Sequence, residues 1–206
     1  MKKLIYLFII LFTLFYSNVT YTQNVDVREY YNEICGNTEW GGSIKPAKYK
    51  KNIKIFVAGN KSSELLEELE EIVDELNQLI TTIDIIITED KTDYNLLVYF
   101  GSPFKYMDFI KDHSDSERLE NNWGLFAFYR SYNDRSEIVS SEVFVNTIDT
   151  KNTTQQKHLL REELTQSIGF PNDSYRYKNS IFQQKWTEVT EYSELDKTII
   201  KMHYTL

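Results

Sequence analysis

Five segments of the chain have the length and hydrophobic pattern of a β-strand. Residues 53–58 alternate between apolar and polar positions and are rich in β-branched side chains, and residues 83–87 form a second segment of this kind. Residues 94–100 are nearly continuous in apolar side chains, as in an inner strand that is covered on both faces. Residues 124–129 and 138–145 predict two more strands. These segments predict a single sheet.

Two segments have the period of an amphipathic helix and a serine at the start. Residues 63–80 carry apolar side chains at helical spacing, and they follow the first strand directly. The last helix is predicted to begin after Ser193, with Asp196 at its third position and apolar residues continuing to Tyr204. The first of these helices lies between two strands and therefore predicts a parallel, right-handed crossover.

A third helix is predicted from Thr153 to Ile168. Thr153 and Gln156 have the spacing of a capping box at its start. Gly169 can leave the helix through a left-handed conformation, and Pro171, two residues later, cannot continue it. The helix is therefore expected to end abruptly.

The two faces of this third helix differ in chemistry. One face repeats an apolar residue at every fourth position: Leu160, Leu164 and Ile168. Nearly opposite lies a polar stripe with the same spacing, formed by His158, Glu162 and Gln166. Glu163 lies beside this stripe, rotated partway round the helix. Such a stripe is ordinarily a solvated surface, but an imidazole, two carboxyl groups and an amide also suit a catalytic or cation site.

The order of the elements predicts an α/β (α+β) fold in which helices lie on one side of a mixed sheet. Residues 103–110 fit a short helix, and residues 114–122 are read as a polar loop. Asn133-Asp134 favours a hairpin between the last two strands, which adds an antiparallel edge.

The N-terminus has the parts of a secretory signal peptide. Lys2 and Lys3 precede an apolar run to Tyr16, which is shorter than the about 20 residues that span a bilayer. Residues 1–22 are predicted to be removed, although an uncleaved N-terminal anchor is the alternative. We therefore expect a periplasmic or extracellular protein whose mature chain does not span a membrane.

The charge narrows the class of partner. The whole chain has a formal net charge of −8, and loss of residues 1–22 removes Lys2 and Lys3 but no acid, which makes the mature charge −10. This balance argues against a nucleic acid or an anionic membrane surface as partner. The single cysteine, Cys35, cannot form an internal disulfide and is read as a buried or idle thiol. The sequence leaves the oligomeric state open.

The third helix and the turn after it also carry a motif. The order E-E-x-x-Q-x-x-G-x-x-N, from Glu162 to Asn172, resembles the zinc-peptidase helix of the metzincins, H-E-x-x-H-x-x-G-x-x-H. In this resemblance Glu162 and Gln166 take the places of the two helical histidines, and Glu163 that of the catalytic glutamate. Asn172, followed by Asp173, takes the place of the third ligand.

Further segments support the resemblance, which covers residues 52–206. Residues 179–183 resemble the turn under the metal that usually reads Ser-Ile-Met, with Phe182 in place of the methionine. Residues 193–204 resemble the closing helix S-x-x-D…LY. The resemblance implies a zincin-like domain with a site helix and a C-terminal helix, preceded by a lead-in at residues 23–51. It is nearest to a group of secreted bacterial domains of unassigned function that carry this altered helix.

The resemblance implies a metal-dependent hydrolase, peptidase-like, with Glu163 as general base. The candidate metal ligands are listed in chain order: His158, Glu162, Gln166, Asn172 and Asp173. Zinc is the ion that the family implies, whereas oxygen donors suit Ca²⁺, Mg²⁺ or Mn²⁺ better. A hydrogen bond or ion pair between His158 and Glu162 is the simpler interpretation of that pair, and then no ion is needed.

Two hypotheses of different classes follow. In the first, the chain is a secreted hydrolase with altered metal ligands that acts on a polypeptide substrate. In the second, it is a catalytically inactive zincin-like domain that binds a peptide or serves as a scaffold in the cell envelope. No glycine-rich phosphate loop follows the first strand, so a nucleotide enzyme has no support.

Overall fold

The computed structural model describes residues 26–36 and 45–206 except Asp115 and Lys151. The expected signal peptide, residues 1–22, lies outside the described residues. In chain order, the elements are α2 (Val27–Cys35), β1 (Lys48–Tyr49), β2 (Ile53–Gly59), α3 (Ser63–Leu79), β3 (Ile85–Thr88), β4 (Leu96–Gly101), α4 (Pro103–Ile110), α5 (Ser116–Glu120), β5 (Gly124–Arg130), β6 (Glu137–Asn146), α6 (Thr153–Ser167) and α7 (Glu194–Thr205).

One mixed sheet contains the six strands of the described chain. Its order is β1-β6-β4-β2-β3 with parallel pairing throughout, and β5 pairs antiparallel with β6. The helix α3 crosses between β2 and β3, and β5 and β6 form the hairpin. The predicted α/β class, the parallel crossover and the antiparallel hairpin are therefore confirmed.

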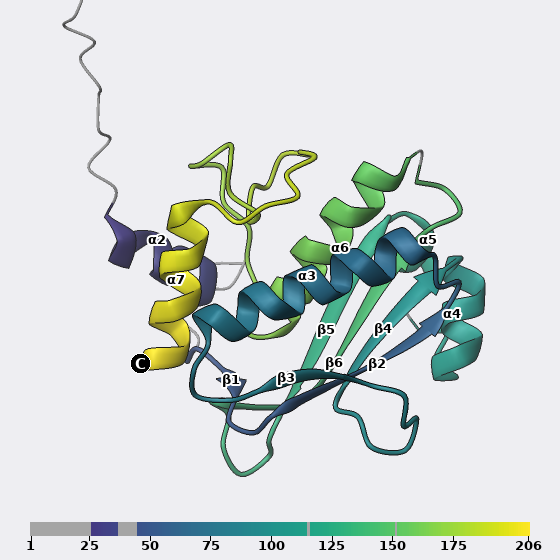
Figure 1. The fold of residues 1–206 in the computed structure, drawn as a ribbon, viewed down its shortest axis with the longest axis horizontal. Coiled ribbons are helices and arrows are strands. Elements are labelled where there is room, and N and C mark those ends of the chain that lie inside the picture. Colours follow the sequence, from purple (N-terminus) through teal and green to yellow (C-terminus); the bar gives the residue numbers. More distant parts are fainter. Residues whose placement is uncertain (1–25, 37–44, 115, 151) are drawn as a thin grey trace, which may run out of the picture.

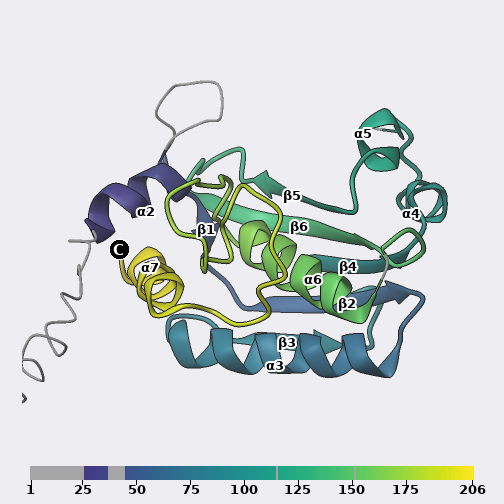
Figure 2. The same cartoon turned by 90° about the horizontal axis from the view of Figure 1, so that it is seen from above.

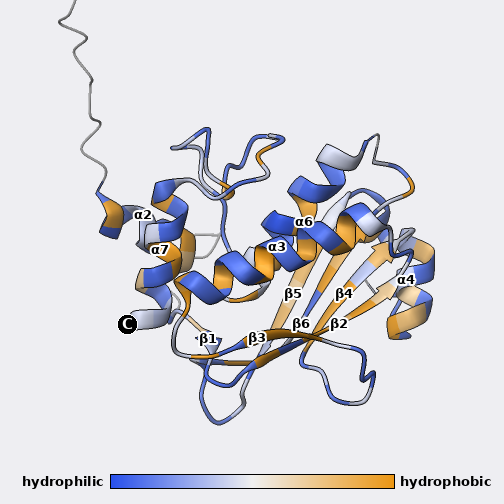
Figure 3. Ribbon diagram, in the orientation of Figure 1, coloured by the Kyte–Doolittle hydropathy of each residue, from blue (hydrophilic) through white to orange (hydrophobic). Residues whose placement is uncertain are grey.

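Both faces of the sheet carry helices, although only one side was expected to. Figures 1 and 2 show α3 and α6 crossing the same face, where they enclose the main core. Side chains of α4 and α5 cover part of the second face with a smaller cluster that includes Tyr106, Met107, Leu119, Leu97 and Tyr99. In Figure 3 the strands are coloured mostly as hydrophobic, whereas α3 carries both hydrophobic and hydrophilic residues. The region expected to be a polar loop, residues 114–122, contains α5.

The helix α2 extends the same core at one end of the sheet, where it lies beside α7 (Figures 1 and 2). Tyr30 and Ile34 are fully buried in the main core. The Lys48 amine on β1 donates to the carbonyl oxygens of His203 and Tyr204 at 3.0 and 3.3 Å, which stabilises the C-terminal end of α7. Within the described residues, no helix is both long and apolar enough to cross a bilayer.

The ends of α6 differ slightly from the prediction. The N-cap is Asn152, whose side-chain oxygen accepts from the Gln155 N–H at 2.9 Å, so the expected capping box of Thr153 and Gln156 is wrong by one residue. Gly169 has φ +128°, and a β-carbon there would overlap the Ala47 carbonyl oxygen. The abrupt end therefore depends on glycine for both conformation and space.

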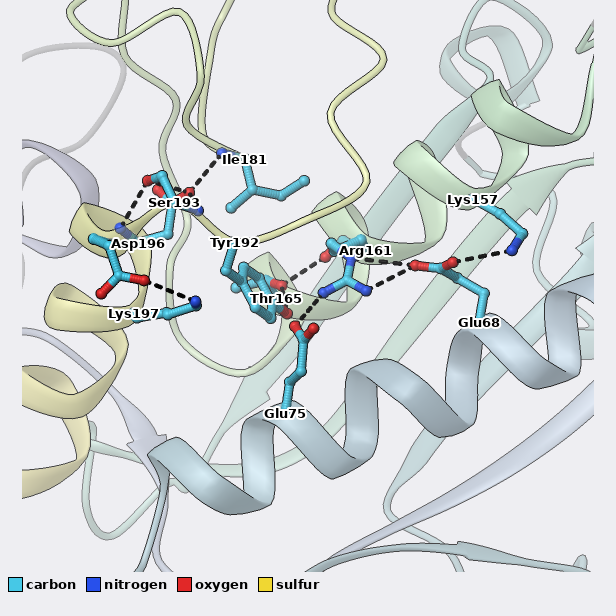
Figure 4. A network of polar contacts seen from close by, with 11 residues as sticks. Glu68, Glu75, Lys157, Arg161, Thr165, Ile181, Tyr192, Ser193, Asp196 and Lys197 are labelled. Carbon is cyan, nitrogen blue, oxygen red and sulfur yellow. Dashed lines mark hydrogen bonds and ion pairs between the residues drawn. The ribbon is translucent and has the colours of Figure 1, made fainter.

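An ion-pair cluster joins α6 to α3 (Figure 4). The buried Arg161 guanidinium contacts Glu68 at 2.9 Å and Glu75 at 2.5 Å, and Lys157 contacts the second oxygen of Glu68 at 3.3 Å. The guanidinium also lies 4.8 Å from the centre of the Tyr192 ring. Glu68 is buried although it is charged, because its partner lies on the facing helix.

Loss of Arg161 should destabilise the protein strongly. Arg161→Met leaves Glu68 buried with Lys157 as its remaining cationic partner, and we expect a loss of about 3–5 kcal/mol in the free energy of unfolding. The double variant Arg161→Met/Glu68→Leu should recover much of that loss, because both buried charges are then gone. Urea unfolding measures both. Lys50→Met, at the exposed Lys50–Asp134 pair, is the control and should have a small effect. Equal losses for the exposed and the buried pair would contradict the assignment.

Candidate functional site

The polar stripe of α6 faces the segment 170–192 rather than open solvent. His158 is buried, and its Nε2 atom lies 3.3 Å from Glu162 Oε2, while Nδ1 lies 2.7 Å from the Val189 carbonyl oxygen. Burial alone would lower the pKa of His158, but the contact with Glu162 and the Val189 carbonyl raise it above its ordinary value. The predicted pair of His158 and Glu162 is thus present.

The chain returns to α6 after the glycine turn, and it does so at Asp173. The Gln166 amide nitrogen donates to Asp173 Oδ1 at 2.6 Å. Asn172, the neighbouring candidate, points its amide nitrogen at α2, where it donates to the Ile34 and Glu33 carbonyl oxygens at 3.0 and 3.2 Å. The structure therefore brings together Glu162, Gln166, Asp173 and His158, and it uses the Asn172 amide nitrogen to hold the N-terminal helix.

Glu163 lies against the first residue of the edge strand β5. A β-carbon at Gly124 would overlap Glu163 Oε1, so the carboxyl group lies directly against this glycine. Burial, and then the negative charges of Glu162 and Asp173, raise the pKa of Glu163 well above its ordinary value, against the opposing charge of Arg118. The structure gives the carboxyl no hydrogen-bond partner among the described residues. This carboxyl group at the sheet edge therefore binds its proton more tightly than an ordinary glutamate does.

Two tryptophans that the sequence analysis did not select border this cluster. Trp123 precedes Gly124, and its ring packs edge-to-face on Trp186 with 5.3 Å between centroids. Trp186 in turn packs edge-to-face on His158, also at 5.3 Å. Trp186 lies in the segment 170–192, which has no regular period, so no hydrophobic pattern could predict its position. Its aromatic side chain was the only feature of the sequence that pointed to it.

The turn at residues 179–183 is fixed from below by α7. The Ser180 hydroxyl donates to Asp196 Oδ1 at 2.5 Å, and the Ile181 N–H donates to Asp196 Oδ2 at 3.1 Å. Asp196 also forms the predicted capping box with Ser193 (Figure 4). The described contacts of Ser180 lead to Tyr30, Phe182 and Asp196, so the turn supports the segment 170–192 rather than joining the carboxyl cluster.

The donor set does not fit a zinc ion. In the described part of the chain, no group of three or more histidine, cysteine, aspartate or glutamate side chains could hold a metal. His158 is the one imidazole on the stripe, and its two nitrogens face Val189 and Glu162. The amide nitrogen of Asn172 points to α2. We therefore assign no chemical step to a metal, and the ligand set of His158, Glu162, Gln166, Asn172 and Asp173 remains untested as a prediction.

Comparisons with known proteins give a family and a distant fold likeness. A family model described as "Protein of unknown function (DUF2927)" matches residues 24–205. No curated protein matches the chain in sequence. Two solved structures are similar: "Crystal structure of myroilysin", at 10% identity over 84% of this chain and 90% of that chain with a TM-score of 0.45, and "Structure of Myroilysin", at 10% identity over 76% and 80% with a TM-score of 0.42. Likenesses this distant support no argument about activity.

The proton on Glu163 should make stability depend on pH. The folded chain holds this proton to a higher pH than the unfolded chain, whose ordinary value is 4.5, so stability falls as pH rises through the window above 4.5. The slope from this group is up to about 1.4 kcal/mol for each pH unit in that window. Glu163→Gln removes the loss, so its stability relative to wild type should increase as the pH rises above about 4.5, until the folded wild-type carboxyl has also lost its proton.

Urea unfolding at several pH values measures this difference between Glu163→Gln and wild type. Glu70→Gln, at an exposed position of α3, is the matched control and should leave the pH profile unchanged. A difference between Glu163→Gln and wild type that stays constant with pH would show that this carboxyl is ionised at neutral pH.

Proposed function

Because the chain belongs to the DUF2927 family, whose function is unassigned, we propose a function from its own geometry: it is an exported, zincin-like domain that binds polypeptide in extended form. The binding place is the outer edge of β5, beside the α6 cluster. The observation that carries the proposal is the placement of Glu163, Trp123 and Trp186 where the edge strand begins.

The edge strand supplies main-chain hydrogen-bonding groups. Within the described residues, β5 pairs with β6 along one of its edges. The residues of β5, Gly124 to Arg130, are only partly buried. An extended peptide can add to such an edge, with main-chain hydrogen bonds supplying affinity and side-chain sites supplying specificity. The mature charge and the lack of a basic surface excess favour a polypeptide over a nucleic acid.

The α6 cluster supplies side-chain contacts next to that edge. A peptide paired with the start of β5 passes Gly124, against which Glu163 lies, and then the two indoles. Glu163 offers a carboxyl group with a raised pKa, which donates a hydrogen bond while it is protonated. The cluster therefore suits recognition of a peptide backbone or side chain at one fixed position.

Hydrolysis of the bound polypeptide is the second candidate function, and one observation favours it. Burial, and then the charges of Glu162 and Asp173, raise the pKa of Glu163 well above its ordinary value. A carboxyl group with a raised pKa can take up and return a proton during a reaction. In this candidate Glu163 handles the proton, as the motif also implies, and the edge strand positions the scissile bond.

Backbone N-methylation tests the binding proposal. We expect residues 23–206 to bind a fluorescent peptide of about ten residues, a length that covers β5. In an extended strand, successive N–H groups point to opposite edges. N-methylation at every second residue should therefore weaken binding about ten-fold or more, and methylation of the intervening residues should not. Fluorescence polarisation measures both series, and each is the control for the other.

Three further results decide between the candidates. Absence of peptide binding, or weakening without a period of two, would refute pairing with β5. Cleavage of casein that Glu163→Gln abolishes while peptide binding persists would establish the hydrolase.

Because the donor set does not fit zinc, elemental analysis should find no stoichiometric zinc, and a chelator should leave the melting temperature unchanged.

A further inference from the structure

The surroundings of the two indoles are rich in carboxyl groups. Glu162 lies against His158, which packs on Trp186, and Glu163 lies against Gly124, which follows Trp123. Asp173 joins them through Gln166, and Glu188, two residues after Trp186, acts electrostatically on His158. Four carboxyl groups therefore gather here from α6 and the segment 170–192.

The cations that face this group are fewer. His158 lies between Glu162 and Trp186, and Arg118 on α5 acts on Glu163 from a distance. The two other cations of α6, Arg161 and Lys157, point to α3 and are paired with Glu68 and Glu75. Among these described side chains, His158 of α6 is paired with Glu162, and the carboxyl groups still outnumber the cations that face them.

The indoles and Glu163 indicate what kind of cation would fit. Trp123 and Trp186 remain 38% and 48% exposed although they pack on each other, so part of each ring is open to a ligand. Glu163 is 8% exposed and has no hydrogen-bond partner among the described residues. An aromatic face beside carboxylates attracts an organic cation, whereas a metal ion would need donors converging on one point, which the described residues do not provide.

We propose that this site selects polypeptides by a lysine or arginine side chain, whose cationic group lies on the Trp186 and Trp123 rings and is neutralised by Glu162 and its neighbouring carboxylates. This inference rests on the proposed function, because the peptide backbone has to be paired with β5 to bring the side chain into place. It adds the substrate class, which main-chain pairing alone does not specify. A long flexible cation is suited to the site because its apolar stem can lie along the indoles while its head reaches the carboxylates.

Matched peptides that differ only in charge test the proposal. The probe is the fluorescent peptide described above with one central arginine, and its partner carries citrulline, which has the same shape without the charge. We expect the arginine peptide to bind residues 23–206 about ten-fold more tightly. Trp186→Leu should bring the two affinities within about two-fold of each other, and Glu162→Gln should also reduce the difference.

Two control variants separate the indole from general damage. Trp186→Phe keeps an aromatic face and should retain part of the preference for arginine. Tyr132→Leu removes a 96% exposed aromatic ring in the β5–β6 turn and should leave the preference intact.

The possible outcomes distinguish this inference from the proposed function. Equal binding of the arginine and citrulline peptides, with the period of two in the N-methyl series preserved, would overturn the cation preference and leave peptide binding standing. A preference that survives Trp186→Leu would overturn the role of the indole. If neither peptide binds, the proposed function fails and this inference fails with it.

Discussion

The ion pair between Arg161 and Glu68 fixes the orientation of the helix on which the whole site depends. A charge as buried as Arg161 costs several kcal/mol unless a partner neutralises it, and among the described residues its carboxylate partners, Glu68 and Glu75, both lie on α3. Once Arg161 points to α3, the helical period fixes the direction of every other side chain on α6. Glu163 is two residues on, or about 200° round the helix, which directs it to β5 on the opposite side.

The same constraint explains why so polar a helix can be buried. The Thr165 hydroxyl donates a hydrogen bond to the Arg161 carbonyl oxygen and lies within hydrogen-bond distance of the Tyr192 hydroxyl, each at 2.6 Å. The Gln166 amide nitrogen donates to Asp173. These polar groups are satisfied by α3 and the segment 170–192 rather than by water. Glu163 is the contrast: it is buried in the same helix without a hydrogen bond to the described chain. Burial and the nearby charges of Glu162 and Asp173 raise the pKa of this group.

The sequence predicted most of the fold because the strands and the helices α3 and α7 are specified by local patterns. Alternation identified β2, and the Ser193–Asp196 spacing identified the cap of α7. The helix α2 was missed, although its buried residues Tyr30, Tyr31, Ile34 and Cys35 do have helical spacing, because tyrosines give a weak hydrophobic signal. The burial of Glu68 was missed because its partner lies 93 residues away and no local pattern encodes such a pair.

The candidate site was predictable as far as the helical period extends. That period correctly placed His158 next to Glu162 and put Glu163 on a different side. Beyond Gly169 the chain is irregular, and successive residues of an extended segment point in opposite directions. Asn172 therefore contacts α2 while Asp173 contacts Gln166, and a motif that assigns both to one site cannot separate them. The indole of Trp186 comes from a segment with no period and was accessible only from the structure.

The proposed ligand and the proton on Glu163 act on the same negative charge, so their binding is linked. Burial raises the pKa of Glu163 most, and the charges of Glu162 and Asp173 raise it further because a proton on Glu163 reduces the repulsion among the three carboxyl groups. A lysine or arginine head group beside the indoles would reduce that repulsion in another way and would therefore lower the pKa. By reciprocity, protonation of Glu163 must weaken the binding of the cation by the same factor. A cluster of carboxyl groups would thus respond to two kinds of cation, the proton and the ligand's head group, and the relation between them follows from charge alone.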